Sequence, residues 1–139
     1  MNAFFQYKKG QAMSDLSNYL EDALLNAVFR NTTYTSPATV YAALFTVAPG
    51  EAGGGTEVTG GGYARKSITF GAPSSNTIAN TNDVTWTPSG ANYGTVLAVG
   101  IFDASSAGNL LAYKTITSQV VNDGNTFHFP AASLTVNLN

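Results

Sequence analysis

The sequence predicts a mainly β fold: an antiparallel β-sandwich, jelly-roll-like or Ig-like, with one N-terminal amphipathic α-helix. Apolar residues recur with helical spacing in residues 14–30. From Thr39 onward they recur with a period of two, in short runs rich in β-branched and aromatic residues. The 139 residues have the size of one domain. We therefore expect an N-terminal arm over residues 1–13 and a single helix-plus-sandwich domain over residues 14–139.

The helix is predicted from the stretch SDLSNYLEDALLNAVFR, residues 14–30. Ser14 is expected to cap its first turn, and Asn31 to take the left-handed conformation that ends it. The spacing of its apolar residues predicts one apolar face, made of Leu16, Tyr19, Leu20, Ala23, Leu24, Ala27 and Val28.

Eight strands are predicted, near residues 39–47, 63–70, 76–79, 83–87, 94–102, 109–117, 126–129 and 133–138. The runs VYAALF and VLAVGIF are continuously apolar, so both are expected to be central strands covered on both faces, by the helix or by a neighbouring subunit. Turn-forming residues at 106–109 and 123–124 predict mostly antiparallel connections.

The composition excludes several classes of function. Charged residues make up 10% of the chain, against about 25% in a typical domain, and the six Lys and Arg are scattered. We therefore expect no nucleic-acid partner. The start MNAFFQYKKGQAM predicts neither a secretory signal nor a membrane span. With no Cys and one His, His128, we expect no metal and no cofactor.

Two glycine triplets, at residues 53–55 and 60–62, raise the question of a ligand-binding loop. The first lacks the lysine of a phosphate loop, and the second leads into a predicted strand rather than a helix. Both are therefore predicted to shape a loop. A role of that loop in contacts with another subunit is a second hypothesis.

No catalytic residue is predicted. The sequence around His128, FHFPA, shows no nucleophile motif, and Glu51 and Glu57 in a glycine-rich loop are expected to be solvated. Core packing is the favoured role of the pairs Trp86 with Tyr93 and Tyr34 with Tyr41, over a platform for sugar stacking.

Four blocks carry a resemblance: LSNYLEDALLNAVFRNTTYTSPATVYAALFT, GGGTEVTGGGYARKSITFGAP, YGTVLAVGIFDASSAGNLLAYKTIT and FPAASLTVNLN. In this order they resemble a family of small bacteriophage virion structural proteins, often labelled tail-fibre or hypothetical structural proteins. The resemblance implies a non-enzymatic part of a phage particle, present in many copies and with no catalytic residues to transfer.

Residues 1–12 depart from the family, whose usual beginning resembles the sequence from Met13 onward. Lys8-Lys9-Gly10 is what a ribosome-binding sequence would encode, so one reading is an upstream start assignment. The other reading is an apolar arm, containing Phe4, Phe5 and Tyr7, that docks on a partner.

The resulting functional hypothesis is a capsid decoration or cement protein that binds the lattice of the major capsid protein, assembled in the host cytoplasm and carried in the virion. We expect a homo-oligomer, with a trimer favoured. The alternative is a tail-fibre or tail-tip component involved in host attachment; an enzyme acting on host polysaccharide is a third and weaker reading. The candidate interface residues are Phe4, Phe5, Tyr7, Gly60, Gly61, Gly62, Tyr63 and Arg65.

Overall fold

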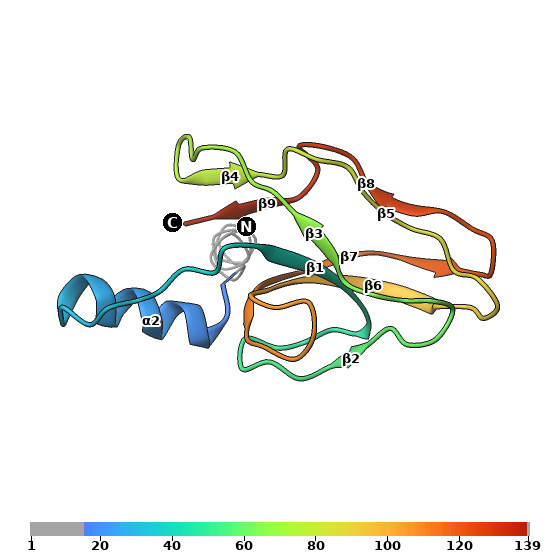
Figure 1. Ribbon diagram of the computed structural model, residues 1–139, viewed down its shortest axis with the longest axis horizontal. Coiled ribbons are helices and arrows are strands. Elements are labelled where there is room, and N and C mark those ends of the chain that lie inside the picture. The colour runs from blue at the N-terminus through green and yellow to red at the C-terminus, as the bar shows by residue number, and fades with distance from the viewer. Residues whose placement is uncertain (1–15, 139) are drawn as a thin grey trace, which may run out of the picture.

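The computed structural model describes residues 16–138, a mainly β fold with antiparallel sheets and one N-terminal helix, as the sequence predicts. Figure 1 shows the arrangement. The elements are α2 (Asn18–Phe29), β1 (Val40–Val47), β2 (Thr56–Glu57), β3 (Lys66–Ile68), β4 (Thr77–Ala79), β5 (Val84–Trp86), β6 (Gly94–Phe102), β7 (Leu110–Val121), β8 (Phe127–Phe129) and β9 (Thr135–Asn137).

The largest sheet contains five strands in the order β2-β1-β6-β7, with β3 also paired to β1. As predicted from their continuous apolar runs, β1 and β6 lie at its centre, and most of their residues are buried. Gly100 is needed here, because a Cβ would lie 2.9 Å from the Phe45 ring and 3.0 Å from Leu110. The close packing of the aromatic rings on this face thus depends on a missing side chain.

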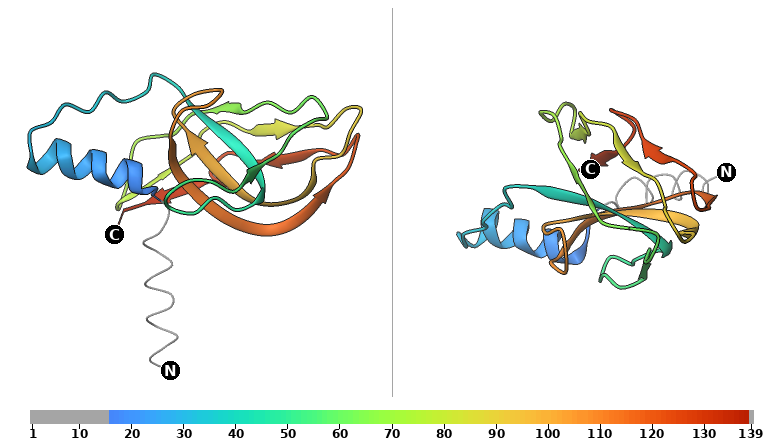
Figure 2. Two further views of the ribbon diagram at one scale, coloured as in Figure 1. Left: turned by 90° about the horizontal axis from the view of Figure 1, so that it is seen from below. Right: turned by 45° about the vertical axis from the view of Figure 1, so that its right-hand side comes forward.

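Two small sheets, β4–β9 and β5–β8, form the second layer and share one apolar core with the large sheet. Figure 2 shows these strands crossing over it. Trp86, Phe127 and Phe129 form an aromatic cluster whose ring centroids lie 5.2–6.3 Å apart. His128 is exposed between the two buried phenylalanines, as the period of two predicts.

The helix begins one turn later than predicted. Ser17, not Ser14, is its N-cap, and its Oγ accepts a hydrogen bond from Leu20 N at 3.2 Å. Ser14 lies outside the described residues. Asn31 has a φ of 54°, so the predicted left-handed stop is confirmed. The start of α2 is attached to the body by hydrogen bonds from Ser17 N to Leu111 O and from Asn18 N to Glu51 O.

The apolar face predicted for the helix is only partly covered by the described residues. No residue of α2 is buried, and the helix projects from one side of the sheets (Figures 1 and 2). Leu20 and Leu24 pack partly against the core, but Val28 is 70% exposed. The reason is physical: helical spacing tells which side is apolar, not whether the same chain covers it. The outer face of β1 and β6 is covered by loops instead.

Other differences are local. The strand predicted at 63–70 is reduced to β3, and the one at 109–117 extends to Val121, which pairs with Gly94. The two-residue β2 was missed because a strand that short has no period. The turn at 123–124 forms and leads into β8, as predicted, and β8 pairs with β5 and not with β7.

Asn80 provides a test of the second layer. Its buried side chain donates hydrogen bonds to Asn82 O and Pro130 O and accepts one from Leu134 N at 2.8 Å. Asn80→Ala leaves these backbone groups unpaired, and we expect a loss of about 2–4 kcal/mol in the free energy of unfolding, measured with urea. Asn125→Ala, which removes one exposed hydrogen bond to Asn122 N, should cost less than about 1 kcal/mol. Equal losses would contradict this account.

Candidate functional site

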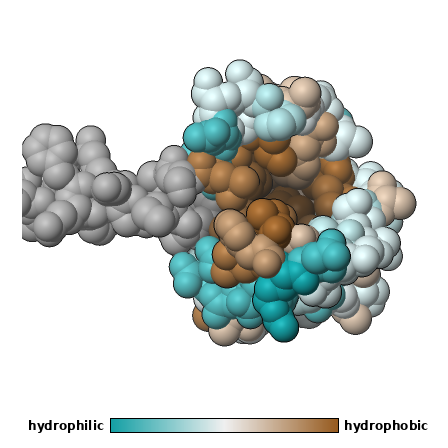
Figure 3. All heavy atoms as spheres, turned by 90° about the vertical axis from the view of Figure 1, so that its left-hand side faces the viewer, coloured by the Kyte–Doolittle hydropathy of each residue, from teal (hydrophilic) through white to brown (hydrophobic). Residues whose placement is uncertain are grey.

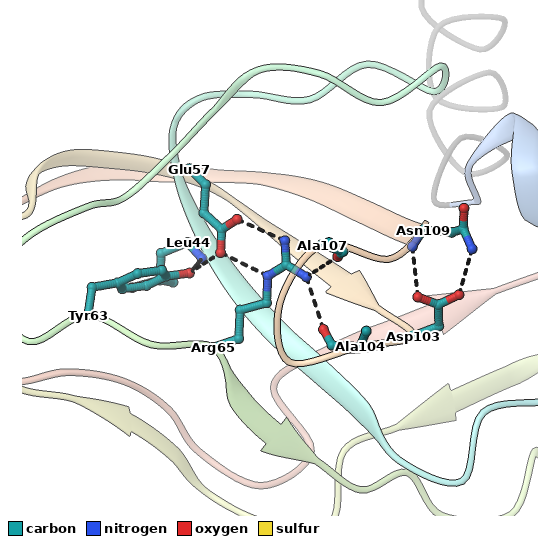
Figure 4. Close-up of polar contacts among 8 residues, drawn as sticks. All are labelled: Leu44, Glu57, Tyr63, Arg65, Asp103, Ala104, Ala107 and Asn109. Carbon is teal, nitrogen blue, oxygen red and sulfur yellow. Dashed lines mark hydrogen bonds and ion pairs between the residues drawn. The ribbon is translucent and has the colours of Figure 1, made fainter.

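Arg65 is the centre of a network that joins loops to the large sheet (Figure 4). Its guanidinium forms a bidentate ion pair with Glu57, with Nε to Oε1 and Nη2 to Oε2 both at 2.9 Å. Nη1 donates to the carbonyl oxygens of Ala104 at 2.9 Å and Ala107 at 2.7 Å. The side chain of Arg65 is only 8% exposed, so the charge is held inside the protein by hydrogen bonds to two separate segments.

The ring of Phe102 lies beneath this guanidinium. The Arg65 Cζ is 3.6 Å from the ring centroid, a cation–π contact, and Phe102 stacks at 6.1 Å on Phe45 of β1. Arg65 therefore caps the outer face of the two central strands. This is the cover that the sequence assigned to the helix or a neighbouring subunit.

Tyr63 connects the ion pair to the backbone of β1. Its hydroxyl donates to Glu57 Oε1 at 2.8 Å and accepts from Leu44 N at 2.9 Å, while its ring packs edge-on against Tyr93. Burial raises the pKa of Tyr63, and the Glu57 carboxylate raises it further, whereas the Leu44 N–H and the Arg65 charge oppose the rise. The hydroxyl is thus held protonated as a donor.

The turn between β6 and β7 presents the two carbonyls that Arg65 uses. Asp103 accepts from Asn109 N at 2.7 Å and from Asn109 Nδ2 at 2.8 Å. Gly108 has a φ of 72°, and a Cβ there would lie 2.3 Å from the Asp103 carboxylate, so the position requires glycine. The GIFDA and GNLL blocks therefore build a turn that fits the TEVTGGGYAR block.

A hollow of ≈ 640 Å³ opens beside the network. Its wall includes the Gly53–Gly55 segment, Tyr19, Glu51, Asn109 and the Arg65–Glu57 pair. The expectation of a solvated Glu57 is wrong. Its side chain is only 27% exposed, and both oxygens of its carboxylate accept hydrogen bonds from Arg65. A pair engaged in this way orders the loops and leaves neither Glu57 nor Arg65 free to act as an acid or a base. No group of three His, Asp or Glu suited to a metal ion occurs in residues 16–138.

A second concave feature lies on the side where α2 projects. We call it the α2 groove: a hollow of ≈ 560 Å³ between the helix and the β4–β9 sheet. Figure 3, viewed from this side, shows apolar surface gathered in and around a hollow. The described residues that line it carry no charge: Leu16, Leu20, Leu24, Pro73, Ser75, Asn76, Ile78, Val136 and Leu138.

Residues 15–137 match the family Gp80, described as podophage GP4 fiber I protein gp80. The chain belongs to this family. The predicted resemblance to phage virion structural proteins is thereby confirmed. A search of curated proteins found no match. Within the described part of this fiber I family member, no helix is long and apolar enough to cross a membrane.

The structure brings three of the predicted interface residues of this Gp80-family chain close together: Gly61, Tyr63 and Arg65. Gly61 is buried, with a φ of 55°, and a Cβ would lie 2.5 Å from Ala91 O. Gly60 and Gly62 are exposed beside it. Phe4, Phe5 and Tyr7 lie outside the described residues. Contact of these eight residues with another subunit stays a prediction.

The sequence missed Glu57, Phe102, Asp103 and Asn109. A signal existed, because all four lie in two of the four blocks that carry the family resemblance. Trp86 and Tyr93 are buried at 1% and 6% exposure, which leaves them inside the core and not on a sugar-binding surface. The Trp86 Nε1 donates to the carbonyl oxygen of Ala64 at 2.9 Å, and Ala64 lies between Tyr63 and Arg65 in the sequence.

The bidentate pair predicts that lysine cannot replace Arg65. Arg65→Lys keeps the charge but loses the fork geometry and both carbonyl bonds, so we expect a loss of about 2–4 kcal/mol in unfolding free energy. Lys66→Arg, the converse change at the exposed neighbouring position, should stay within about 0.5 kcal/mol of wild type. Urea titrations of both variants measure this, and a harmless Arg65→Lys would refute the role of the network.

The raised pKa of Tyr63 predicts a pH dependence. Because the folded pKa lies above the unfolded value of 10.0, the stabilisation is complete below pH 10 and is lost as pH rises beyond it. Tyr63→Phe should therefore be less stable than wild type at pH 7, by about 1–2 kcal/mol, and this difference should shrink above pH 10 by at most about 1.4 kcal/mol per pH unit. Denaturant unfolding from pH 7 to 11.5 measures it; a difference that stays constant would contradict the assignment.

Proposed function

We propose that the chain is a non-enzymatic structural subunit of a podophage fiber. The observation that supports it is the family match over residues 15–137, which includes α2, all nine described strands and both blocks that meet at Arg65. The description of the family as a fiber I protein favours this proposal over the capsid-decoration hypothesis drawn from the sequence.

The geometry is consistent with a part that binds rather than reacts. Arg65, Glu57 and Tyr63 use their polar groups to hold loops against the sheet. Such an arrangement gives the loops beside the ≈ 640 Å³ hollow a fixed shape, which suits contact with another surface. In a fiber, that surface is either a neighbouring virion protein or the host cell.

Capsid decoration is the second proposal. Its support is the shape of the described part: residues 16–138 fold into two packed layers with a short projecting helix, and these residues contain no long shaft (Figure 2). In both proposals the partners are other structural proteins of the particle, and the chain assembles as a homo-oligomer, with a trimer favoured.

Quantitative mass spectrometry of purified particles, separated into heads and tails, tests these proposals. For a fiber subunit we expect few copies relative to the major capsid protein, all in the tail fraction. Copies close in number to the major capsid protein, recovered with emptied heads, would overturn the fiber proposal in favour of decoration. Peptides that precede Met13 in the same spectra would show whether residues 1–12 are translated.

A further inference from the structure

We propose that the α2 groove receives the helix α2 of a second copy of this chain. This inference rests on the proposed self-association and names its surface. It is independent of where in the virion the chain is carried.

The helix carries apolar side chains that the other residues of the described range 16–138 do not cover. On one side Leu20 and Leu24 line the groove. On another side lies what we call the α2 ridge: Leu25, Val28 and Phe29, exposed at 56%, 70% and 79%. Leu20 with Leu24 and Leu25 with Phe29 are both spaced by four residues, so each pair forms a continuous strip along one side of the helix.

A helix of this length gains little from its own backbone. With 12 residues, α2 is at the lower limit at which an isolated helix is even marginally stable in water. Helices in proteins are stabilised chiefly by packing an apolar face, yet none of the residues of α2 is buried. A partner that covers the ridge would supply packing that residues 16–138 of a single copy do not provide.

The groove has the chemistry of such a partner site. The described residues that line it are apolar or uncharged, so it favours an apolar insert over a charged segment, nucleic acid or sugar. Its wall includes the sheet residues Ile78 and Val136 opposite Leu20 and Leu24. The ridge of a neighbouring copy is apolar and helical, and it is present on every copy at the same concentration as the groove.

Area also favours a second copy. Phe29 alone exposes roughly 160 Å², and an exposed apolar patch beyond a few hundred Å² is uncommon on a monomer. A stable protein–protein interface nevertheless needs about 800 Å² from each partner, more than the ridge provides. A second copy adds to this area, because each copy contributes both a ridge and a groove.

The test uses the full-length chain and light scattering coupled to size exclusion. We expect the wild-type protein to have a mass of at least twice the 14.5 kDa of one chain. The double variant Leu25→Glu with Phe29→Lys removes two of the three apolar side chains of the ridge. It also adds a favourable Glu–Lys pair to the helix, so the helix itself is not weakened. We expect its dissociation constant to rise by roughly tenfold or more. Val120→Lys, an equally apolar-to-charged change at a position 59% exposed on β7, should associate like wild type.

Cross-linking tests the pairing of ridge with groove. The chain contains no cysteine, so single-cysteine variants can form disulfides only between copies. In a mixture of differently tagged proteins, Phe29→Cys should cross-link to Leu138→Cys, in the groove wall, faster than to Val120→Cys.

The outcomes separate the proposals. A chain that is monomeric at all concentrations overturns self-association and this surface together. An oligomer whose mass is unchanged by the ridge variant overturns the surface alone. If a protein beginning at Met13 loses association while the ridge variant keeps it, the occupant is the N-terminal segment, and the proposal is also overturned. None of these results bears on the mass-spectrometric test of fiber against decoration.

Discussion

The cover on the outer face of the central strands depends on the contacts of the Arg65 guanidinium. A buried charge is tolerated when it is neutralised and its hydrogen-bonding groups are satisfied. Glu57 supplies the neutralisation and the turn between β6 and β7 supplies two carbonyl acceptors. Glu57 lies 8 residues from Arg65 in sequence, whereas Ala107 in the turn lies 42 residues from it. One side chain therefore fixes two separate loops that have little regular structure of their own.

The central sheet and this contact constrain each other. The guanidinium lies on Phe102, Phe102 stacks on Phe45, and the absence of a side chain at Gly100 allows the rings to pack this closely. The Tyr63 hydroxyl then satisfies the N–H of Leu44 in β1. The two central strands are consequently covered on one face by the aromatic core and on the other by a charged residue and the rings beneath it.

The sequence predicts the elements better than their surroundings. Continuous apolar runs identify β1 and β6, and the residue Asn31 marks the end of the helix, because both signals are local. The pairing of Glu57 with Arg65 requires the glycine loop between them to reverse the chain. The spacing of apolar residues in the sequence does not indicate such a reversal. The exposure of α2 was unpredictable for a related reason, since amphipathicity describes the helix and not what lies beside it.

The glycine loop has one further property that follows from its geometry. Gly55 is confined, because a Cβ there would lie 2.4 Å from Val47 O, but a Cβ at Gly53 or Gly54 would meet nothing within 4 Å. A side chain at either of these two positions would thus meet no neighbouring atom, and both positions line the hollow beside Arg65 and Glu57. We expect residues inserted between Gly53 and Gly54 to leave the ion pair of Arg65 and Glu57 intact. This loop is therefore a suitable position at which to display a foreign peptide.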